Sequence, residues 1–136
     1  MSTVAPVKRA IVQAMRASPA LVAAISGGIN EGLAPRKVRY PFIVYQLVAA
    51  PREHQFDGAQ IHALFDISVF AENPVDANNV DALITAALDD KDLTVDGQTN
   101  MLCRRVAELP TGPDTDSEGR RIFQVGGSYS VWTDLG

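Results

Sequence analysis

Apolar side chains in the first part of the chain recur at the spacing of one helix face. Between residues 6 and 16 they fall every three or four positions, at Val7, Ala10, Ile11, Ala14 and Met15. Pro6 fits the first helical turn, where its missing N–H needs no partner. Ser18 can cap a short second helix beginning at Pro19, and Gly27-Gly28 can end it. The pattern therefore predicts two helices, followed by a loop over residues 29–41.

Two later segments have the composition and alternation of β-strands. Residues 42–49 (FIVYQLVA) are mostly β-branched and aromatic. Residues 61–70 alternate apolar and polar side chains with a period of two, which is typical of a half-buried strand. The polar segment 51–59 between them contains Pro51 and the turn signal Asp57-Gly58. We expect an antiparallel pair of strands with an extended tip at 51–59.

The clearest helix signal follows these strands. Asn73 can cap the helix and Pro74 can take its first position. One apolar stripe runs along it, through Ala77, Val80, Leu83, Ile84, Ala87 and Leu88. The acidic run 89–92 is unfavourable at the negative end of a helix, so the helix is expected to end near residue 88.

The last third of the chain predicts two more strands, at 100–109 and 120–133, joined by a turn-rich acidic loop at 110–119. Gly126-Gly127 suggests a bulge in the second of them. The predicted order is α-α-β-β-α-β-β. We therefore expect an α+β fold, an antiparallel four-stranded sheet with helices packed on it, in one domain over residues 1–136.

Composition narrows the class of protein. The 136 residues are 46% hydrophobic and 21% charged, as in ordinary globular proteins. No apolar stretch approaches the ~20 residues of a membrane-spanning helix, and the basic N-terminal segment lacks the apolar core of a signal peptide. The single cysteine excludes an intramolecular disulfide and fits a reducing compartment.

Charge is divided unevenly along the chain. The net charge is −4, but residues 1–52 carry +6 and residues 53–136 carry −10. An acidic total argues against general affinity for nucleic acid. Two regions of opposite sign could bring copies of the chain together, or the folded surface could interleave both signs.

Candidate catalytic and metal-binding chemistry is sparse. His54 and His62 lack the spacing of a zinc site, and Cys103 lies in a predicted strand where packing explains it. No nucleophile-elbow, P-loop or dinucleotide-binding motif occurs, so we expect no enzyme and no cofactor. The alternative from the residues is a small ligand-binding module or enzyme that uses His54, His62 and Asp66.

Residues 114–119 match the first half of a calcium-binding loop, with Asp114, Asp116 and Glu118. The twelfth position, where such a loop needs a bidentate glutamate, is Val125, and a strand follows where a helix should. A solvated hairpin tip is the better interpretation of this segment.

Aromatic and basic residues gather in one region of the sequence: Tyr40, Phe42, Tyr45 and Phe56 near Arg36, Arg39 and Arg52. Three interpretations fit this composition. The aromatic residues could be core residues of a strand, the group could form a protein interface, or it could bind single-stranded nucleic acid.

Several phrases, taken in order, resemble a known family. They are Ile29-Asn30-Glu31-Gly32-Leu33-Ala34-Pro35, Tyr40-Pro41-Phe42-Ile43-Val44-Tyr45-Gln46, the Phe56-Asp57-Gly58 turn, Phe70-Ala71-Glu72, the helix over 75–88 and Tyr129-Ser130-Val131-Trp132. Together they cover nearly the whole chain. Their order and spacing resemble the tail completion proteins, or tail terminators, of long-tailed bacteriophages and gene transfer agents. Asn30 departs from the family, which often has an aromatic residue there.

The resemblance implies a structural virion protein without catalytic activity. Such subunits form homohexameric rings at the head-proximal end of the tail tube, stop its polymerisation and join the tail to the head connector. The implied partners are further copies, the tail tube protein and the head–tail connector protein. DNA would pass through the ring without specific binding, and no membrane is involved. The implied location is the virion tail, after assembly in the host cytoplasm.

The resemblance and the charge pattern together suggest where the contacts lie. We expect the basic residues near a subunit or tube interface, the acidic loop as their counterpart, and the 51–59 tip docked on a neighbour. The candidate interface residues are Arg36, Lys37, Arg39, Arg52, Glu53, His54, Phe56, Asp57, Asp114, Asp116 and Glu118. Acidic residues should line the lumen of the ring, because they would repel passing phosphates.

Overall fold

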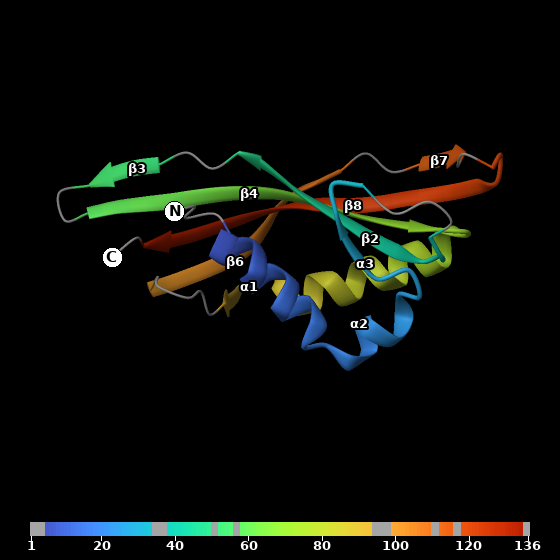
Figure 1. Cartoon of the computed structure of the whole chain (residues 1–136), viewed down its shortest axis with the longest axis horizontal. Helices are drawn as coiled ribbons and strands as arrows, with labels where there is room; N and C mark the ends of the chain where they lie inside the picture. The colour runs from blue at the N-terminus through green and yellow to red at the C-terminus, as the bar shows by residue number, and fades with distance from the viewer. Residues whose placement is uncertain are drawn as a thin grey trace.

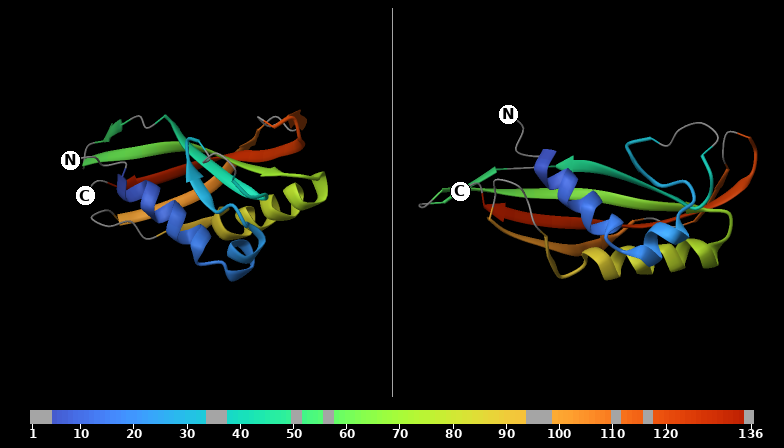
Figure 2. Two further views of the ribbon diagram at one scale, coloured as in Figure 1. Left: turned by 45° about the vertical axis from the view of Figure 1, so that its right-hand side comes forward. Right: turned by 60° about the horizontal axis from the view of Figure 1, so that its bottom comes forward.

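The computed structural model describes residues 5–33, 38–49, 52–55, 58–93, 99–109, 112–115 and 118–134. Within them, one long twisted sheet carries three helices, all on the same face (Figure 1). The two further views of Figure 2 show the same two layers, with helices on one side of the strands only. The chain is therefore an α+β protein, as its sequence predicts.

The helices begin where their capping residues predict. They are α1 (Ala5–Arg16), α2 (Pro19–Ala24) and α3 (Pro74–Leu88). The Ser18 hydroxyl accepts a hydrogen bond from the Leu21 N–H at 3.3 Å, and the Asn73 side-chain oxygen accepts one from the Asp76 N–H at 2.8 Å. Each bond satisfies an amide that has no partner within its helix.

The sheet contains long strands and short ones. Its strands are β1 (Ile29–Glu31), β2 (Phe42–Ala49), β3 (Arg52–Gln55), β4 (Gly58–Ala71), β5 (Lys91–Leu93), β6 (Thr99–Glu108), β7 (Gly112–Thr115) and β8 (Arg121–Asp134). The order across the sheet is β1-β2-β4-β8-β6-β5, while β3 pairs with β4 and β7 pairs with β8. The pair β1–β2 is parallel and the others are antiparallel.

The predicted antiparallel four-stranded sheet is thus correct for the long strands and wrong for the sheet as a whole. β2, β4, β8 and β6 are the four predicted strands, and they pair antiparallel. The predicted loops 29–41, 51–59 and 110–119 each contribute a short strand, and residues 91–93 form another. These strands are three or four residues long and mostly polar, so they carry no alternation that a sequence pattern could detect. The β1–β2 pairing makes the sheet mixed.

The core lies between the helices and the sheet. On β4, the side chains of Ala63, Phe65, Ile67 and Val69 face the helices and are fully buried. The apolar stripes predicted for α1 and α3 pack against them, with Val7, Ile11, Met15, Val80, Ile84 and Leu88 buried in the same cluster. The alternation of apolar and polar residues in the sequence therefore predicts correctly which face of β4 is buried against the helices.

The predicted bulge at Gly126-Gly127 is wrong. The register of β8 against β4 is unbroken from Gln60↔Asp134 to Ala71↔Phe123. The register shifts instead in the pairing of β6 with β8, between Thr99 and Leu102 and between Arg105 and Ala107, and Ala107 beside the second shift is exposed. The glycines serve close packing: a Cβ on Gly127 would lie 2.5 Å from Cζ of Arg105.

Cys103 gives the core a measurable dependence on pH. Burial, together with the smaller effect of the nearby Asp89 carboxylate, raises the pKa of its thiol from 9.0 to about 12. The folded protein keeps this proton while the unfolded chain loses it near pH 9, so the contribution to stability is complete below pH 9 and lost as the pH rises toward 12. We expect the free energy of unfolding to fall by up to about 1.4 kcal/mol per pH unit in that window through this group.

The variant Cys103→Val tests this pH dependence. Urea unfolding at pH 8, 9 and 10 should show a shallower decline of stability in the variant than in the wild type. The wild-type thiol should also react with a disulfide reagent at pH 8 only after unfolding. Equal slopes for the two proteins would contradict the assignment.

Candidate interaction surfaces

The face of the sheet opposite the helices is open in the described chain, and His62 lies on it. The His62 ring stacks on Trp132, with centroids 3.9 Å apart and planes 11° apart. Its Nε2 shares a hydrogen bond with the Ser130 hydroxyl at 2.5 Å. Two residues of β8 thus position this imidazole: Trp132 contacts its face and Ser130 contacts its edge. His62 is half-buried on the outer face, on the polar side of β4 as predicted.

Asp66 lies on the same face but belongs to a different cluster. The Ser128 hydroxyl donates a 2.7 Å hydrogen bond to its carboxylate. A shallow cavity of about 350 Å³ lies there, lined by Asp66, Ser68, Gln124 and neighbours, and His62 does not line it. His62 and Asp66 are four residues apart on one strand, roughly 13 Å at 3.3 Å per residue. The side chain of His54 lies outside what the structure describes, so the described residues of the alternative enzyme site do not converge.

Arg39 and Glu118, two of the predicted interface residues, line one cavity within the same copy. This cavity of about 490 Å³, here called the Arg39 cavity, is also lined by Tyr40, Glu72 and Arg120. The Arg120 guanidinium lies 5.3 Å from the centroid of the Tyr40 ring and 3.5 Å from the Glu118 carboxylate. Basic and acidic segments that are distant in sequence are therefore neighbours within one subunit.

Most other predicted interface residues lie at positions whose side chains the structure does not describe. Arg36, Lys37, Phe56, Asp57 and Asp116 fall outside the described residues. The backbone of Arg52, Glu53 and His54 forms β3, and that of Asp114 forms β7, both paired with long strands. Figure 1 places β3 and β7 at opposite ends of the sheet. No group of three or more potential metal ligands was found in the described part of the chain.

The aromatic residues of the 40–45 segment are packing residues. Phe42 stacks on Phe70, with ring centroids 5.1 Å apart, and only 6% of it is exposed. Tyr45 belongs to the main core cluster. Burial raises the pKa of the Tyr45 phenol, and the charge of Glu31 raises it further. The core interpretation therefore holds for Phe42 and Tyr45.

Among the described residues, Arg105 has the most extensively bonded side chain, and the sequence pattern does not predict its role. Only 9% of it is exposed, and it donates 3.0 Å bonds to the Asp81 carboxylate, the Thr85 hydroxyl and the Tyr129 hydroxyl. It also donates to the Glu108 carboxylate and the Gly126 carbonyl. Burial lowers the pKa of the guanidinium, but the bonds to Glu108, Asp81 and Tyr129 outweigh burial and raise it. Arg105 thereby ties α3 to β6 and β8. No sequence signal distinguishes Arg105, because β6 also contains the charged residues Arg104 and Glu108.

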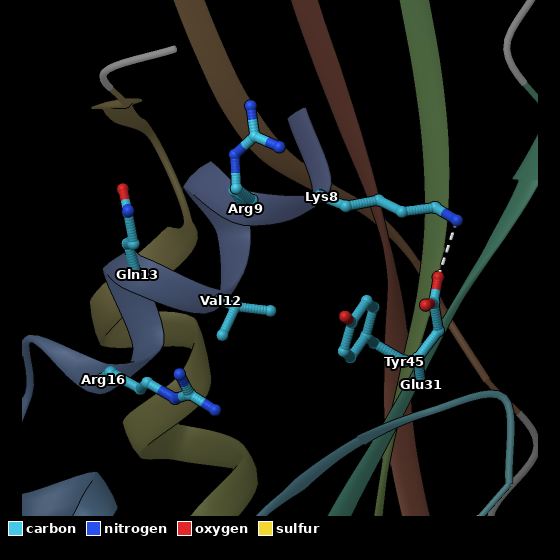
Figure 3. A pocket seen from close by; sticks show the side chains of 7 residues that line it. All are labelled: Lys8, Arg9, Val12, Gln13, Arg16, Glu31 and Tyr45. Carbon is cyan, nitrogen blue, oxygen red and sulfur yellow. Dashed lines mark ion pairs between the residues drawn. The ribbon is translucent and has the colours of Figure 1, made fainter. Parts of the chain in front are cut away.

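A groove between α1 and the β1 edge was also missed. Its lining residues, which define the α1 groove, are Lys8, Arg9, Val12, Gln13, Arg16, Glu31 and Tyr45, around a volume of about 410 Å³ (Figure 3). Lys8 pairs with Glu31 at 2.6 Å across it. The helical pattern of residues 6–16 predicts that Arg9, Gln13 and Arg16 share the polar face, but only the fold places Glu31 and Tyr45 opposite them.

One face of the sheet is open, and the grooves of the surface are lined by charged residues. In the described part of the chain no catalytic residues converge. This combination fits a subunit that binds other proteins or assembles with them. The family model described as Tail completion protein gp17 matches residues 9–125. The chain therefore belongs to the tail completion protein family. It is a structural virion protein of the tail and not an enzyme. Among the described residues, no helix is long and apolar enough to cross a membrane.

Two solved structures share the fold of this chain. A chain of the "Virion of native gene transfer agent (GTA) particle" is 17% identical, with a TM-score of 0.67, and the match covers 98% of this chain and 99% of that one. A second solved structure is 13% identical, with a TM-score of 0.50 and coverage of 93% and 91%. A search of curated proteins found no match. These likenesses extend over the whole length of both chains.

Proposed function

We propose that this protein is a single-domain ring subunit that caps the head-proximal end of the tail tube. Six copies form a ring that stops tube polymerisation and joins the tail to the head connector. The observation that carries the proposal is the family match over residues 9–125, with a fold shared along the whole chain with a gene transfer agent virion protein. The partners are other copies, the tube protein and the connector protein.

The shape of the subunit supports this role. Its long sheet ends in two hairpins, β3–β4 and β7–β8, which reach in opposite directions (Figure 1). A subunit that joins a tube to a connector needs contacts at both ends. Of the predicted interface residues, Arg52, Glu53 and His54 lie on β3 in one hairpin, and Asp114 lies on β7 in the other. We place the tube and connector contacts at these two hairpins.

The acidic total charge supports passage of DNA. At −4 per chain, a hexamer carries a large negative charge, and acidic residues at the lumen would keep the duplex from binding the wall. Assembly takes place in the host cytoplasm before the ring joins the virion.

Native mass spectrometry and negative-stain imaging of the purified protein, alone and with its tube protein, test the proposal. We expect a mass of six chains and sixfold rings, in at least one of the two samples. Particles produced without this protein should carry tubes of uncontrolled length that fail to join heads. A strict monomer in both samples, together with tails of normal length in its absence, would overturn the proposal.

A further inference from the structure

We propose that the α1 groove of one copy binds the acidic segment Asp89–Asp92, which joins α3 to the edge strand β5, of the next copy in the ring. This inference rests on the proposed ring and names the contact that closes it. Three features of the structure carry the inference: the charge and composition of the groove, the exposure of the acidic segment and the positions of the two surfaces in the sheet.

The α1 groove has the composition of a carboxylate-binding surface. Three cationic side chains and one anionic side chain line it, so its net charge is +2. Lys8 is paired with Glu31, whereas Arg9 and Arg16 have no ion-pair partner among the described residues. Both arginines are exposed on α1. A guanidinium group donates two parallel hydrogen bonds to a carboxylate, which fixes direction as well as distance.

Tyr45 adds a polar group to the apolar floor of the groove. Its phenol lies opposite Val12, as Figure 3 shows. Lys8 and Arg16 line the same groove, and burial and the charge of Glu31 raise the pKa of the phenol. The phenol is protonated at neutral pH and can donate one hydrogen bond. The groove therefore offers donors on both walls.

The acidic partner surface lies at the other edge of the sheet. Asp90 adopts a left-handed backbone conformation with φ of 55° directly after α3, and 74% of its side chain is exposed. Among the described residues its ion-pair partner is the exposed Arg104, at 3.3 Å, and such a pair contributes little to stability. The segment Asp89–Asp92 carries three aspartates and one lysine. Its negative charge complements the groove.

The positions of the two surfaces favour a closed ring over a symmetric dimer. The sheet order places β1 at one edge and β5 at the other. A contact between different edges of identical subunits is heterologous, and it closes into a ring when the rotation between copies allows it. A groove at the β1 edge and an acidic segment at the β5 edge meet this requirement.

Cross-linking between copies tests the contact directly. Gln13→Cys in the groove and Lys91→Cys on β5 are made in separate proteins, since both side chains are exposed. We expect a mixed disulfide dimer when the two are combined under mild oxidation, because a disulfide needs Cβ atoms about 4 Å apart. In the control, Gln13→Cys is combined with Arg121→Cys, which is exposed on β8, in place of Lys91→Cys. This pair should give little mixed disulfide dimer. The native Cys103 is buried and should stay reduced.

Charge reversal provides the second measurement. The double variant Arg9→Glu/Arg16→Glu should need about tenfold more protein to assemble at low salt, and Asp90→Lys should restore part of this loss when it is present in the same protein. Arg121→Glu is the matched control and should assemble normally.

The outcomes separate this inference from the proposed function. Mixed disulfide dimers together with sixfold rings support both the groove contact and the proposed ring. Rings without the specific cross-link overturn the groove contact and leave the ring intact. Specific cross-links in a protein that forms no closed ring support the contact and overturn the ring. The absence of rings and of cross-links overturns both.

Discussion

Replacing Arg105 with methionine is expected to destabilise the protein by about 3–5 kcal/mol. The change removes the cation and leaves the Asp81 carboxylate, 16% exposed, with a buried charge and no counter-ion in the described structure. It also removes the donor that the buried Tyr129 hydroxyl and the Thr85 hydroxyl share. Methionine keeps the apolar stem, so the loss reports on charge and hydrogen bonding more than on packing.

Urea unfolding of the variant and of Arg104→Met measures this effect. Arg104 is the neighbouring residue, but its side chain is 60% exposed and pairs only with the exposed Asp90. We expect its replacement to change stability by less than about 1 kcal/mol. Similar losses for the two variants would show that the Arg105 network does not hold α3 to the sheet.

Replacing Gly27 with alanine is expected to cost roughly 3 kcal/mol. A Cβ at this position would lie 2.0 Å from the Arg39 carbonyl oxygen and 2.6 Å from Cβ of Phe42. One contact is with backbone, so no side-chain rotation relieves it. The Gly27 N–H also donates a 3.0 Å hydrogen bond to the Pro41 carbonyl, which the displaced segment would lose. The substitution should therefore separate the end of α2 from the start of β2.

Gly112→Ala provides the matched control, because a Cβ on Gly112 would meet no atom within 4 Å. Its unfolding midpoint should lie close to that of the wild type. The Gly27 variant should also lose the close packing of Phe42 on Phe70, visible as a change in near-ultraviolet circular dichroism. A wild-type midpoint for Gly27→Ala would contradict the close approach.

The helices and long strands could be predicted because their signals are local. Ser18 and Asn73 cap the helices that their sequence positions indicate, and α3 ends at Leu88, before the acidic run. The alternation of residues 61–70 assigns the buried face of β4 correctly. Each of these depends on the spacing of side chains within one segment.

The short strands and the bulge depend on partners elsewhere in the chain. β1 exists because Ile29–Glu31 lie beside β2, and Asn30 supports this position with side-chain hydrogen bonds to the Gly27 and Ile43 carbonyls. The register shift beside Ala107 arises in the pairing of β6 with β8. Pairing energy between segments distant in sequence leaves no periodic signature in either of them.

The candidate surfaces, like the short strands, depend on contacts between segments that are distant in the sequence. The basic and acidic segments are evident in the sequence, but only the fold shows that Arg39 and Glu118 line one cavity within a single copy. Arg105 ties α3 to the sheet through hydrogen bonds to Asp81 and Tyr129, and each of these partners is 24 residues from it in the chain. The α1 groove likewise joins a helix face to Glu31 and Tyr45. These sites are combinations of segments, which a linear pattern does not reveal.

The sequence by itself determined the α+β class, the caps and apolar faces of the helices, the four long strands and the resemblance to tail completion proteins. Periodicity and capping act within a few residues, so they can be read without a fold. Only the tertiary structure decided which strands form the two edges, where Arg105 finds its partners, and that a cationic groove and an acidic segment lie at opposite edges of one sheet. Those features arise from contacts between residues far apart in the chain, whose energies depend on distances that no local pattern specifies.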